Sequence, residues 1–111
     1  MATFTKKQIV TFPFPYTNLE GKKLRPCLIL SNEMKEDILF CQITSKNIQL
    51  DKYVIPLNKN ETMNGTLFIN SYIRSNMLFT GSISNIKKVI CEINEDKYNE
   101  ICNKINSMIK T

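Results

Sequence analysis

The sequence predicts a small, mainly antiparallel β domain that ends in one α-helix. From about position 8 to position 93, short runs rich in β-branched and aromatic residues alternate with polar turns, which is typical of strands. The last segment instead carries apolar residues at spacings of three and four, which indicates an amphipathic helix. A chain of 111 residues, 42% of them hydrophobic, suffices for one core, so we expect a single domain over residues 1–111.

Each strand is predicted from its own apolar run. The runs are Gln8–Phe14, Arg25–Asn32, Ile38–Thr44, Tyr53–Leu57 and Thr66–Tyr72. Pro13 and Pro56 lack a backbone N–H, so their strands are expected to bend there or to lie at an edge. Such interruptions favour a small, strongly curved barrel over a flat sheet. Gly65 and Gly81 are predicted to be turn or bulge residues.

The C-terminal helix has both a face and a start signal in the sequence. Asn94 is a suitable N-cap, and Glu95 and Asp96 complement the positive end of the helix dipole. We expect the apolar face to pack across the barrel. That face consists of Tyr98, Ile101, Cys102, Ile105, Met108 and Ile109. A further helical turn is predicted within residues 82–88.

Composition excludes several kinds of site. The chain has no histidine, which removes histidine triads and histidine-ligated metal centres. The four cysteines form no CxxC pair, so we expect no structural metal and no cofactor. Each lies in an apolar run and is expected to act as a small core residue, which fits a reducing compartment. With no apolar leader and no membrane-length segment, the protein is predicted to be cytoplasmic.

The most informative stretch is the first hairpin, because it places one arginine at the start of an apolar strand. The net charge is +5, and Lys22, Lys23 and Arg25 fall within six residues. A guanidinium group carries a permanent charge and a planar fork of donors, which suits phosphate binding. Nucleic acid is therefore the first substrate class to consider.

A second element is expected to meet this arginine. If the strands starting at Arg25 and ending at Thr44 pair antiparallel, Arg25 lies beside Thr44 and Ser45 at one rim. A fixed arginine and a hydroxyl would stabilise the charge that develops on phosphate oxygens when a ribose 2′-hydroxyl attacks. The alternative is that Arg25 is an ordinary strand-entry cation and that Thr44 and Ser45 form an ordinary turn.

Two further residues are candidates for substrate contact. Tyr16 ends the first strand, where it would either stack on a base or be an ordinary exposed tyrosine. Arg74 would either contact a second phosphate or form a surface ion pair.

Taken in order, these motifs resemble the MazF/PemK (Kid-like) family of toxins from type II toxin-antitoxin systems. The resemblance spans nearly the whole chain. It rests on residues 9–14 followed by Leu19-Glu20-Gly21, on Arg25-Pro26 and the strand after it, on Ile43-Thr44-Ser45, and on Gly65-Thr66-Leu67 before Ser71-Tyr72-Ile73-Arg74.

The resemblance implies a fold and an activity. The fold is an SH3-like barrel with a C-terminal helix, of the type shared by CcdB and MazF. The activity is metal-independent, sequence-selective cleavage of single-stranded RNA, leaving a 2′,3′-cyclic phosphate and a 5′-hydroxyl. The family's catalytic arginine and threonine fall on Arg25 and Thr44. The implied partners are a second copy of the chain, a cognate antitoxin, and operator DNA only through the antitoxin complex.

This sequence also departs from some members of the family. They use a catalytic arginine and aspartate just after the glycine that precedes the fifth strand, and here that stretch reads Phe68-Ile69-Asn70-Ser71. The proton donor and acceptor therefore stay open. A gyrase inhibitor resembling CcdB and a plain nucleic-acid-binding module remain alternative functions.

Overall fold

A computed structural model describes residues 3–15, 22–46, 51–67 and 69–110 of the chain. The described part contains seven strands and one α-helix, so the predicted mainly β class is confirmed. The strands are β1 (Gln8–Pro15), β2 (Lys22–Ile29), β3 (Asp37–Thr44), β4 (Val54–Leu57), β5 (Thr62–Met63), β6 (Ser71–Ser82) and β7 (Lys88–Ile93). The helix α1 spans Glu95–Ile109, and two 3₁₀ turns, η1 and η2, span Lys59–Glu61 and Ile83–Asn85.

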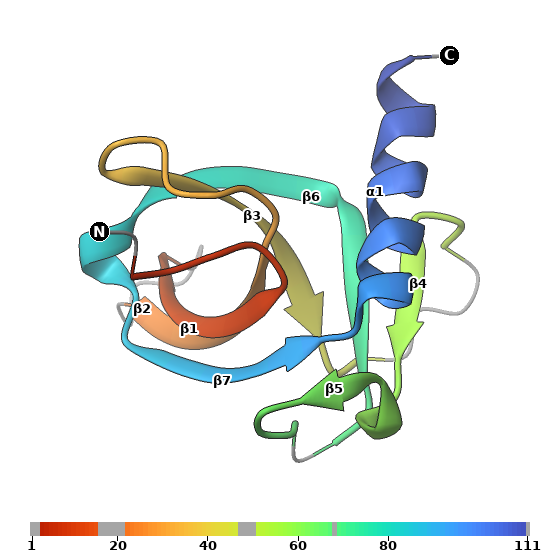
Figure 1. Cartoon of the computed structure of the whole chain (residues 1–111), viewed down its shortest axis with the longest axis horizontal. Coiled ribbons are helices and arrows are strands. Elements are labelled where there is room, and N and C mark those ends of the chain that lie inside the picture. The colour runs from red at the N-terminus through yellow and green to blue at the C-terminus, as the bar shows by residue number, and fades with distance from the viewer. Residues whose placement is uncertain (1–2, 16–21, 47–50, 68, 111) are drawn as a thin grey trace.

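The strands form one antiparallel sheet in the order β4-β6-β3-β2-β1-β7-β5. Figure 1 shows that this sheet curls into a partial barrel, with α1 standing at one side of it. The long strand β6 turns a corner, because its pairing with β3 jumps from Cys41↔Leu78 to Gln42↔Arg74. The three residues between Arg74 and Leu78 make this corner, and beyond it the first half of β6 also pairs with β4.

Two apolar clusters lie on opposite faces of the curled sheet. The first is covered by α1, whose Ile101 is fully buried in it, and it also includes Ile9, Leu28 and Cys41. The second includes Val10, Phe12, Cys27, Ile29, Ile38 and Phe40. Successive side chains of a strand point to opposite faces, so alternate residues of β1, β2 and β3 belong to different clusters.

The helix begins where the sequence predicts. The Asn94 side chain accepts a hydrogen bond from the backbone N–H of Lys97 at 2.8 Å, which is an N-cap contact. Farther along, the Tyr98 hydroxyl donates to the carbonyl oxygen of Leu30 at 2.7 Å. The Tyr98 contact joins the start of α1 to the chain at the end of β2.

The strand predicted over Thr66–Tyr72 is wrong in its position. Strand β6 begins only at Ser71, whereas residues 66, 67, 69 and 70 lie outside any strand. Asn64 and Gly65 have φ values of 55° and 129°, so the chain turns sharply before Leu67. Leu67 is buried in the first cluster without joining the sheet. The helical turn predicted within residues 82–88 is limited to η2.

The structure places Pro13, Pro56 and Gly81, whose positions the sequence singles out, in three different strands. Pro56 lies on the edge strand β4, as predicted. Pairing between β1 and β7 ends at Thr11, and Pro13 lies beyond it in β1. The missing N–H of Pro13 therefore removes no hydrogen bond between β1 and β7. Gly81 is not a turn residue: it pairs with Ile38 inside β6, and a Cβ there would lie 2.6 Å from the Phe12 ring.

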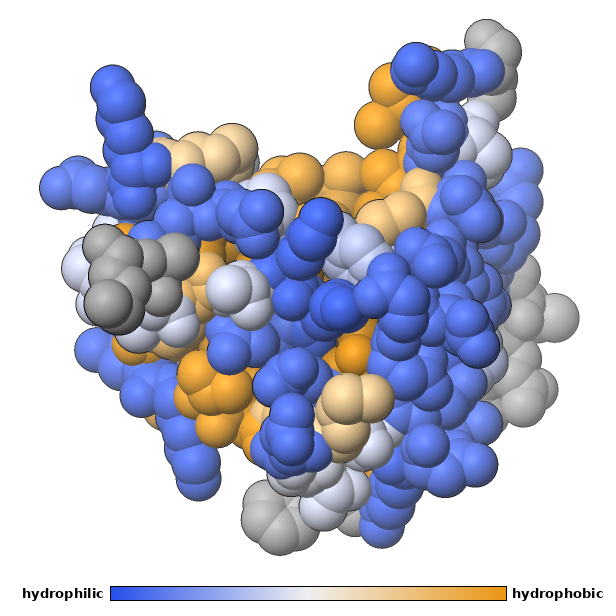
Figure 2. Space-filling model, in the orientation of Figure 1, coloured by the Kyte–Doolittle hydropathy of each residue, from blue (hydrophilic) through white to orange (hydrophobic). Residues whose placement is uncertain are grey.

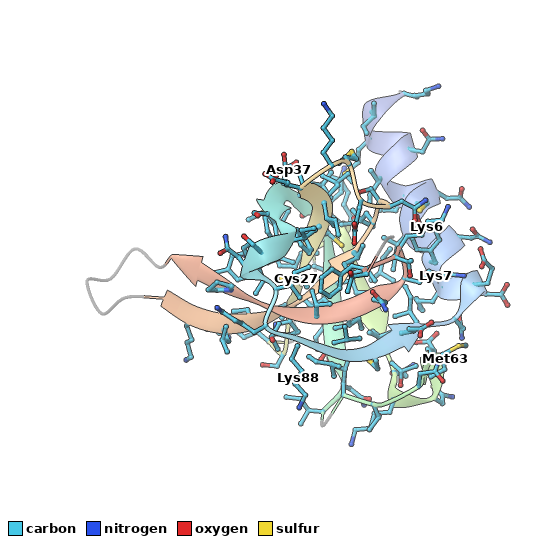
Figure 3. The ribbon with its side chains drawn as sticks, turned by 60° about the vertical axis from the view of Figure 1, so that its left-hand side comes forward. Lys6, Lys7, Cys27, Asp37, Met63 and Lys88 are labelled. Carbon is cyan, nitrogen blue, oxygen red and sulfur yellow. The ribbon has the colours of Figure 1, made fainter. Side chains whose placement is uncertain are left out.

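The cysteines have the environment expected of core residues. Cys27, Cys41 and Cys91 are fully buried, and Cys102 is partly buried. Burial raises the pKa of the Cys27 thiol to about 12 and that of Cys91 to about 11. Figure 3 shows Cys27 inside the curl of the sheet, whereas Lys88 projects outward from β7. The one α-helix of the described chain is too short and too polar to cross a membrane.

Candidate functional site

The strand register gathers polar side chains at one end of the second cluster's face. Directly paired residues of antiparallel strands share a face. Arg25 pairs with Phe12, and Gln42 pairs with Cys27 on one side and with Arg74 on the other. Thr44 stands two residues after Gln42 on β3, so it points to that same face. The apolar floor therefore gives way to a polar end formed by three strands.

These side chains line one pocket of about 210 Å³, which we call the polar pocket. Its polar and charged lining residues are Arg25, Gln42, Thr44, Ser45, Lys46 and Arg74. The predicted meeting of Arg25 with Thr44 and Ser45 at one rim is thus present in the structure. It arises because β2 and β3 pair antiparallel through Cys27↔Gln42, and two residues beyond that pair lie Arg25 and Thr44.

The Thr44 hydroxyl is held in a defined position. Its Oγ1 accepts a hydrogen bond from the backbone N–H of Lys46 at 3.1 Å. A hydroxyl that accepts in this way still has its own hydrogen to donate. Thr44 is therefore oriented to offer a hydrogen bond to an anion in the polar pocket.

Arg74 is half-buried, and its Nε is sealed from solvent. Among the residues that the structure describes, this Nε has no hydrogen-bond partner. A buried donor left unpaired costs about 1–3 kcal/mol, so such a group normally has a partner in the functional state. The guanidinium group lines the polar pocket, where an acceptor would have to enter from outside.

The electrostatic character of the polar pocket is one-sided. Of the described residues, three cations line it, Arg25, Lys46 and Arg74, and no carboxylate does. Positive charges gathered in a concave site attract and orient an anion. Two arginines and a fixed hydroxyl around one point can hold a phosphate group and stabilise additional negative charge on its oxygens.

The other residues predicted to contact substrate do not line the polar pocket or lie outside the described residues. Lys23 is exposed and pairs with Phe14, so it lies on the same face as Arg25 but does not line the polar pocket. The predictions for Tyr16 and for the side chain of Lys22 lie outside the described residues.

An aromatic patch adjoins the polar pocket on the same face. Phe12, Phe14, Phe40 and Phe79 pack with ring centroids 4.9–5.9 Å apart. A shallow pocket of about 580 Å³ lies over the patch and shares Gln42 with the polar pocket. Sequence reasoning missed Gln42, although its place two residues before Thr44 on a predicted strand already puts both on one face.

A second cavity opens on the other side of Arg25. It measures about 450 Å³, and we call it the side cavity. Its walls are mainly apolar and come from Pro26, Ile43, Leu67 and Ile90, with Arg25 and Lys88 also in its lining. Arg25 and Ser45 line both spaces, so the polar pocket and the side cavity are neighbours.

Solved structures share this fold. A MazE-MazF complex from Deinococcus radiodurans superimposes with a TM-score of 0.76 at 17% identity, over 96% of this chain and 95% of the other. An endoribonuclease in complex with its cognate antitoxin, from a mycobacterial species, gives 0.70 at 14% identity, over 96% and 95%. The Mycobacterium tuberculosis toxin MazF-mt6 gives 0.67 at 14% identity, over 90% and 95%.

Sequence comparison assigns the family. No curated protein sequence matches the chain. The family model of PemK-like, MazF-like toxins of type II toxin-antitoxin systems matches residues 5–109, which is nearly the whole chain. The chain therefore belongs to the PemK-like, MazF-like toxin family.

Proposed function

We propose that this protein is a sequence-selective endoribonuclease toxin that cleaves single-stranded RNA without a metal ion. The observation that carries the proposal is the polar pocket, where Arg25, Thr44 and Arg74 converge from three strands. Membership of the toxin family and a fold shared with structures described as endoribonucleases support it.

The reaction is an internal transfer of the phosphoryl group. The ribose 2′-oxygen forms a bond to phosphorus while the bond from phosphorus to the 5′-oxygen breaks. The products are a 2′,3′-cyclic phosphate and a 5′-hydroxyl. The 2′-hydroxyl loses a proton and the 5′-oxygen gains one, so no water is consumed.

Three residues that line the polar pocket have direct roles at the phosphate in this proposal. Arg25 and Arg74 neutralise the two non-bridging phosphate oxygens, and the Thr44 hydroxyl donates to one of them. Arginine keeps its proton at neutral pH and is therefore a poor base. Among the described residues no carboxylate lines the polar pocket, so we assign the proton transfers to water or to substrate oxygens.

Substrate binding extends beyond the polar pocket. Ser45 and Lys46 lie at its rim, and Lys23 is exposed on the same face of β2. We assign these residues, together with Tyr16 and Lys22 of the first hairpin, to contacts with the RNA on either side of the cleaved bond.

The partners form part of the same proposal. The protein acts as a cytoplasmic homodimer, is inhibited by a cognate antitoxin, and reaches operator DNA only through the antitoxin complex. Exposed apolar surface supports a protein partner: Ile109 on α1 is 69% exposed and Leu24 is 53% exposed. Figure 2 shows hydrophobic surface along the side of α1 that faces the sheet, where Leu30, Leu39 and Ile105 line a groove.

The test is an RNA cleavage assay in the presence of EDTA. A long unstructured RNA should yield discrete fragments with cyclic phosphate ends, and Arg25→Ala should reduce the rate at least 100-fold. Lys59→Gln, a change of an exposed lysine on η1, is the matched control and should cleave like the wild type. Intact RNA at high concentrations of a folded, antitoxin-free protein would contradict the proposal.

A further inference from the structure

We propose that the side cavity binds the nucleobase next to the cleaved phosphate and thereby determines which nucleotide the enzyme accepts there. This inference rests on the proposed function. Its starting observation is that Arg25 and Ser45 line both the polar pocket and the side cavity. A nucleotide whose phosphate lies in the polar pocket therefore has its base within reach of the side cavity.

The size and the walls of the side cavity fit a flat, mostly apolar group. Its volume of about 450 Å³ lies in the range of small-molecule sites, which are generally apolar with a few placed polar groups. Pro26, Ile43, Leu67 and Ile90 supply the apolar surfaces against which the faces of a base can pack.

One polar atom in the side cavity is left for a ligand. Thr11 Oγ1 is sealed from solvent, and it has no hydrogen-bond partner within the described part of the chain. A hydroxyl can both donate and accept, and a base edge carries donors and acceptors. Burying this hydroxyl unpaired is unfavourable, and once the Thr11 side chain rotates toward the cavity the edge of a base would supply its missing partner.

The charge around the side cavity selects an anionic ligand. Arg25 and Lys88 line it, and no carboxylate from the described part of the chain does. An uncharged hydrocarbon would gain nothing from these two cations, whereas a nucleotide carries its phosphate beside the base.

The wall that contains Leu67 is held in place by a close approach of two backbone segments. A Cβ on Gly65 would collide with the carbonyl oxygen of Ile90 and would lie 3.2 Å from Cys91 Cβ. The turn before Leu67 is thus pressed against β7, whose Ile90 lines the same space. The side cavity is therefore bounded by segments that are packed together.

The experiment uses an RNA oligonucleotide with one cleavage site and a matching series in which each nucleotide near the cleaved bond is in turn made abasic. The wild type should lose at least tenfold in kcat/KM when one flanking base is missing, because that base no longer fills the side cavity. Ile90→Phe, which fills the cavity, should slow cleavage of the complete RNA and show no further loss on that abasic RNA.

A second variant keeps the proposal testable if Ile90→Phe folds poorly. Thr11→Val removes only the hydroxyl and should reduce the preference for one base at that position about tenfold. Thr80→Val, on an exposed part of β6 outside the side cavity, is the control and should keep the wild-type preference.

Three results would overturn the inference. The first is a response within twofold to every abasic RNA by a wild type that cleaves the complete RNA. The second is that Ile90→Phe and Thr11→Val weaken antitoxin binding and leave base preference unchanged, which would make the occupant a protein segment. The third is a wild type that cleaves no RNA, in which case the proposed function fails as well.

Discussion

The Thr44 hydroxyl accepts a hydrogen bond of 3.1 Å from the backbone N–H of Lys46, two residues beyond the end of β3. A hydroxyl that accepts this bond keeps its own hydrogen available to donate within the polar pocket. The residue thereby combines two tasks, since it caps the turn after β3 and presents a donor beside Arg25.

The first prediction separates these two tasks of Thr44. Thr44→Val keeps the shape of the side chain but removes the donor, so we expect the rate of RNA cleavage to fall about 100-fold. Thr44→Ser keeps the hydroxyl and should retain most of the activity. Single-turnover cleavage at saturating enzyme measures the chemical step. Equal losses in Thr44→Val and Thr44→Ser would show that the hydroxyl does not act as a donor.

The second prediction concerns Arg74, whose Nε is buried without a partner in the described chain. If Arg74 binds a phosphate, Arg74→Gln should weaken RNA binding and make the salt dependence shallower by about 0.7 in the slope of log K against log salt. Fluorescence anisotropy on a non-cleavable 2′-deoxy analogue gives this slope. Lys59→Gln should leave the slope unchanged, and an unchanged slope in Arg74→Gln would assign Arg74 to a structural role.

Much of the fold could be predicted because strand alternation and turn residues are local signals. The meeting of Arg25 and Thr44 also followed from sequence order, since consecutive antiparallel strands place the start of one beside the end of the other. The geometry of such a hairpin follows from two neighbouring strands and needs no knowledge of distant contacts.

Other parts of the site depend on contacts that the sequence order does not reveal. In the sequence, Gln42 is a single polar residue on a predicted buried strand. Its pairing with both Cys27 and Arg74 shows that it lies between β2, which carries Arg25, and β6, which carries Arg74. The apolar residues around Leu67 have the pattern of a strand, but because the chain turns at Gly65, Leu67 packs in the core outside the sheet. The side cavity depends on that misread segment, so it could not be predicted.

The third prediction tests the ion pairs under the first turn of α1. Lys97 Nζ lies 3.1 Å from a carboxylate oxygen of Glu61 and 3.0 Å from one of Glu100, and it donates to the carbonyl oxygen of Pro56 at 3.1 Å. Burial opposes the charge of Lys97, but the hydrogen bonds and charges of the two glutamates outweigh it and raise its pKa.

Replacing Lys97 should therefore destabilise the protein. Lys97→Met leaves Glu61 and the Pro56 carbonyl without their partner, and we expect a loss of about 2 kcal/mol in the free energy of unfolding, measured by urea denaturation. Lys7→Met breaks the Lys7–Glu95 pair, whose side chains are 32% and 63% exposed, and should change the unfolding midpoint much less. Equal effects of the two variants would contradict the special role of the buried lysine.

The last prediction is that the fold loses stability in alkaline solution, above about pH 9. Burial raises the pKa of the Cys27 thiol from 9.0 to about 12 and that of Cys91 to about 11, and it raises the pKa of Cys41 in the same direction. Above pH 9 the unfolded chain releases these protons while the folded chain keeps them, so the free energy of the unfolded state falls relative to that of the folded state.

The sign follows from the raised pKa values: the stabilisation is complete below pH 9 and is lost as pH rises toward 11–12. Each buried thiol contributes a decline of up to about 1.4 kcal/mol per pH unit within that window. Urea denaturation at pH 7, 9 and 10 in a reducing buffer measures it. Cys27→Ala should be less stable at pH 7, because a small void replaces the sulfur, yet its stability should fall less steeply between pH 9 and pH 10. Identical slopes for the variant and the wild type would mean that the Cys27 thiol does not couple unfolding to pH.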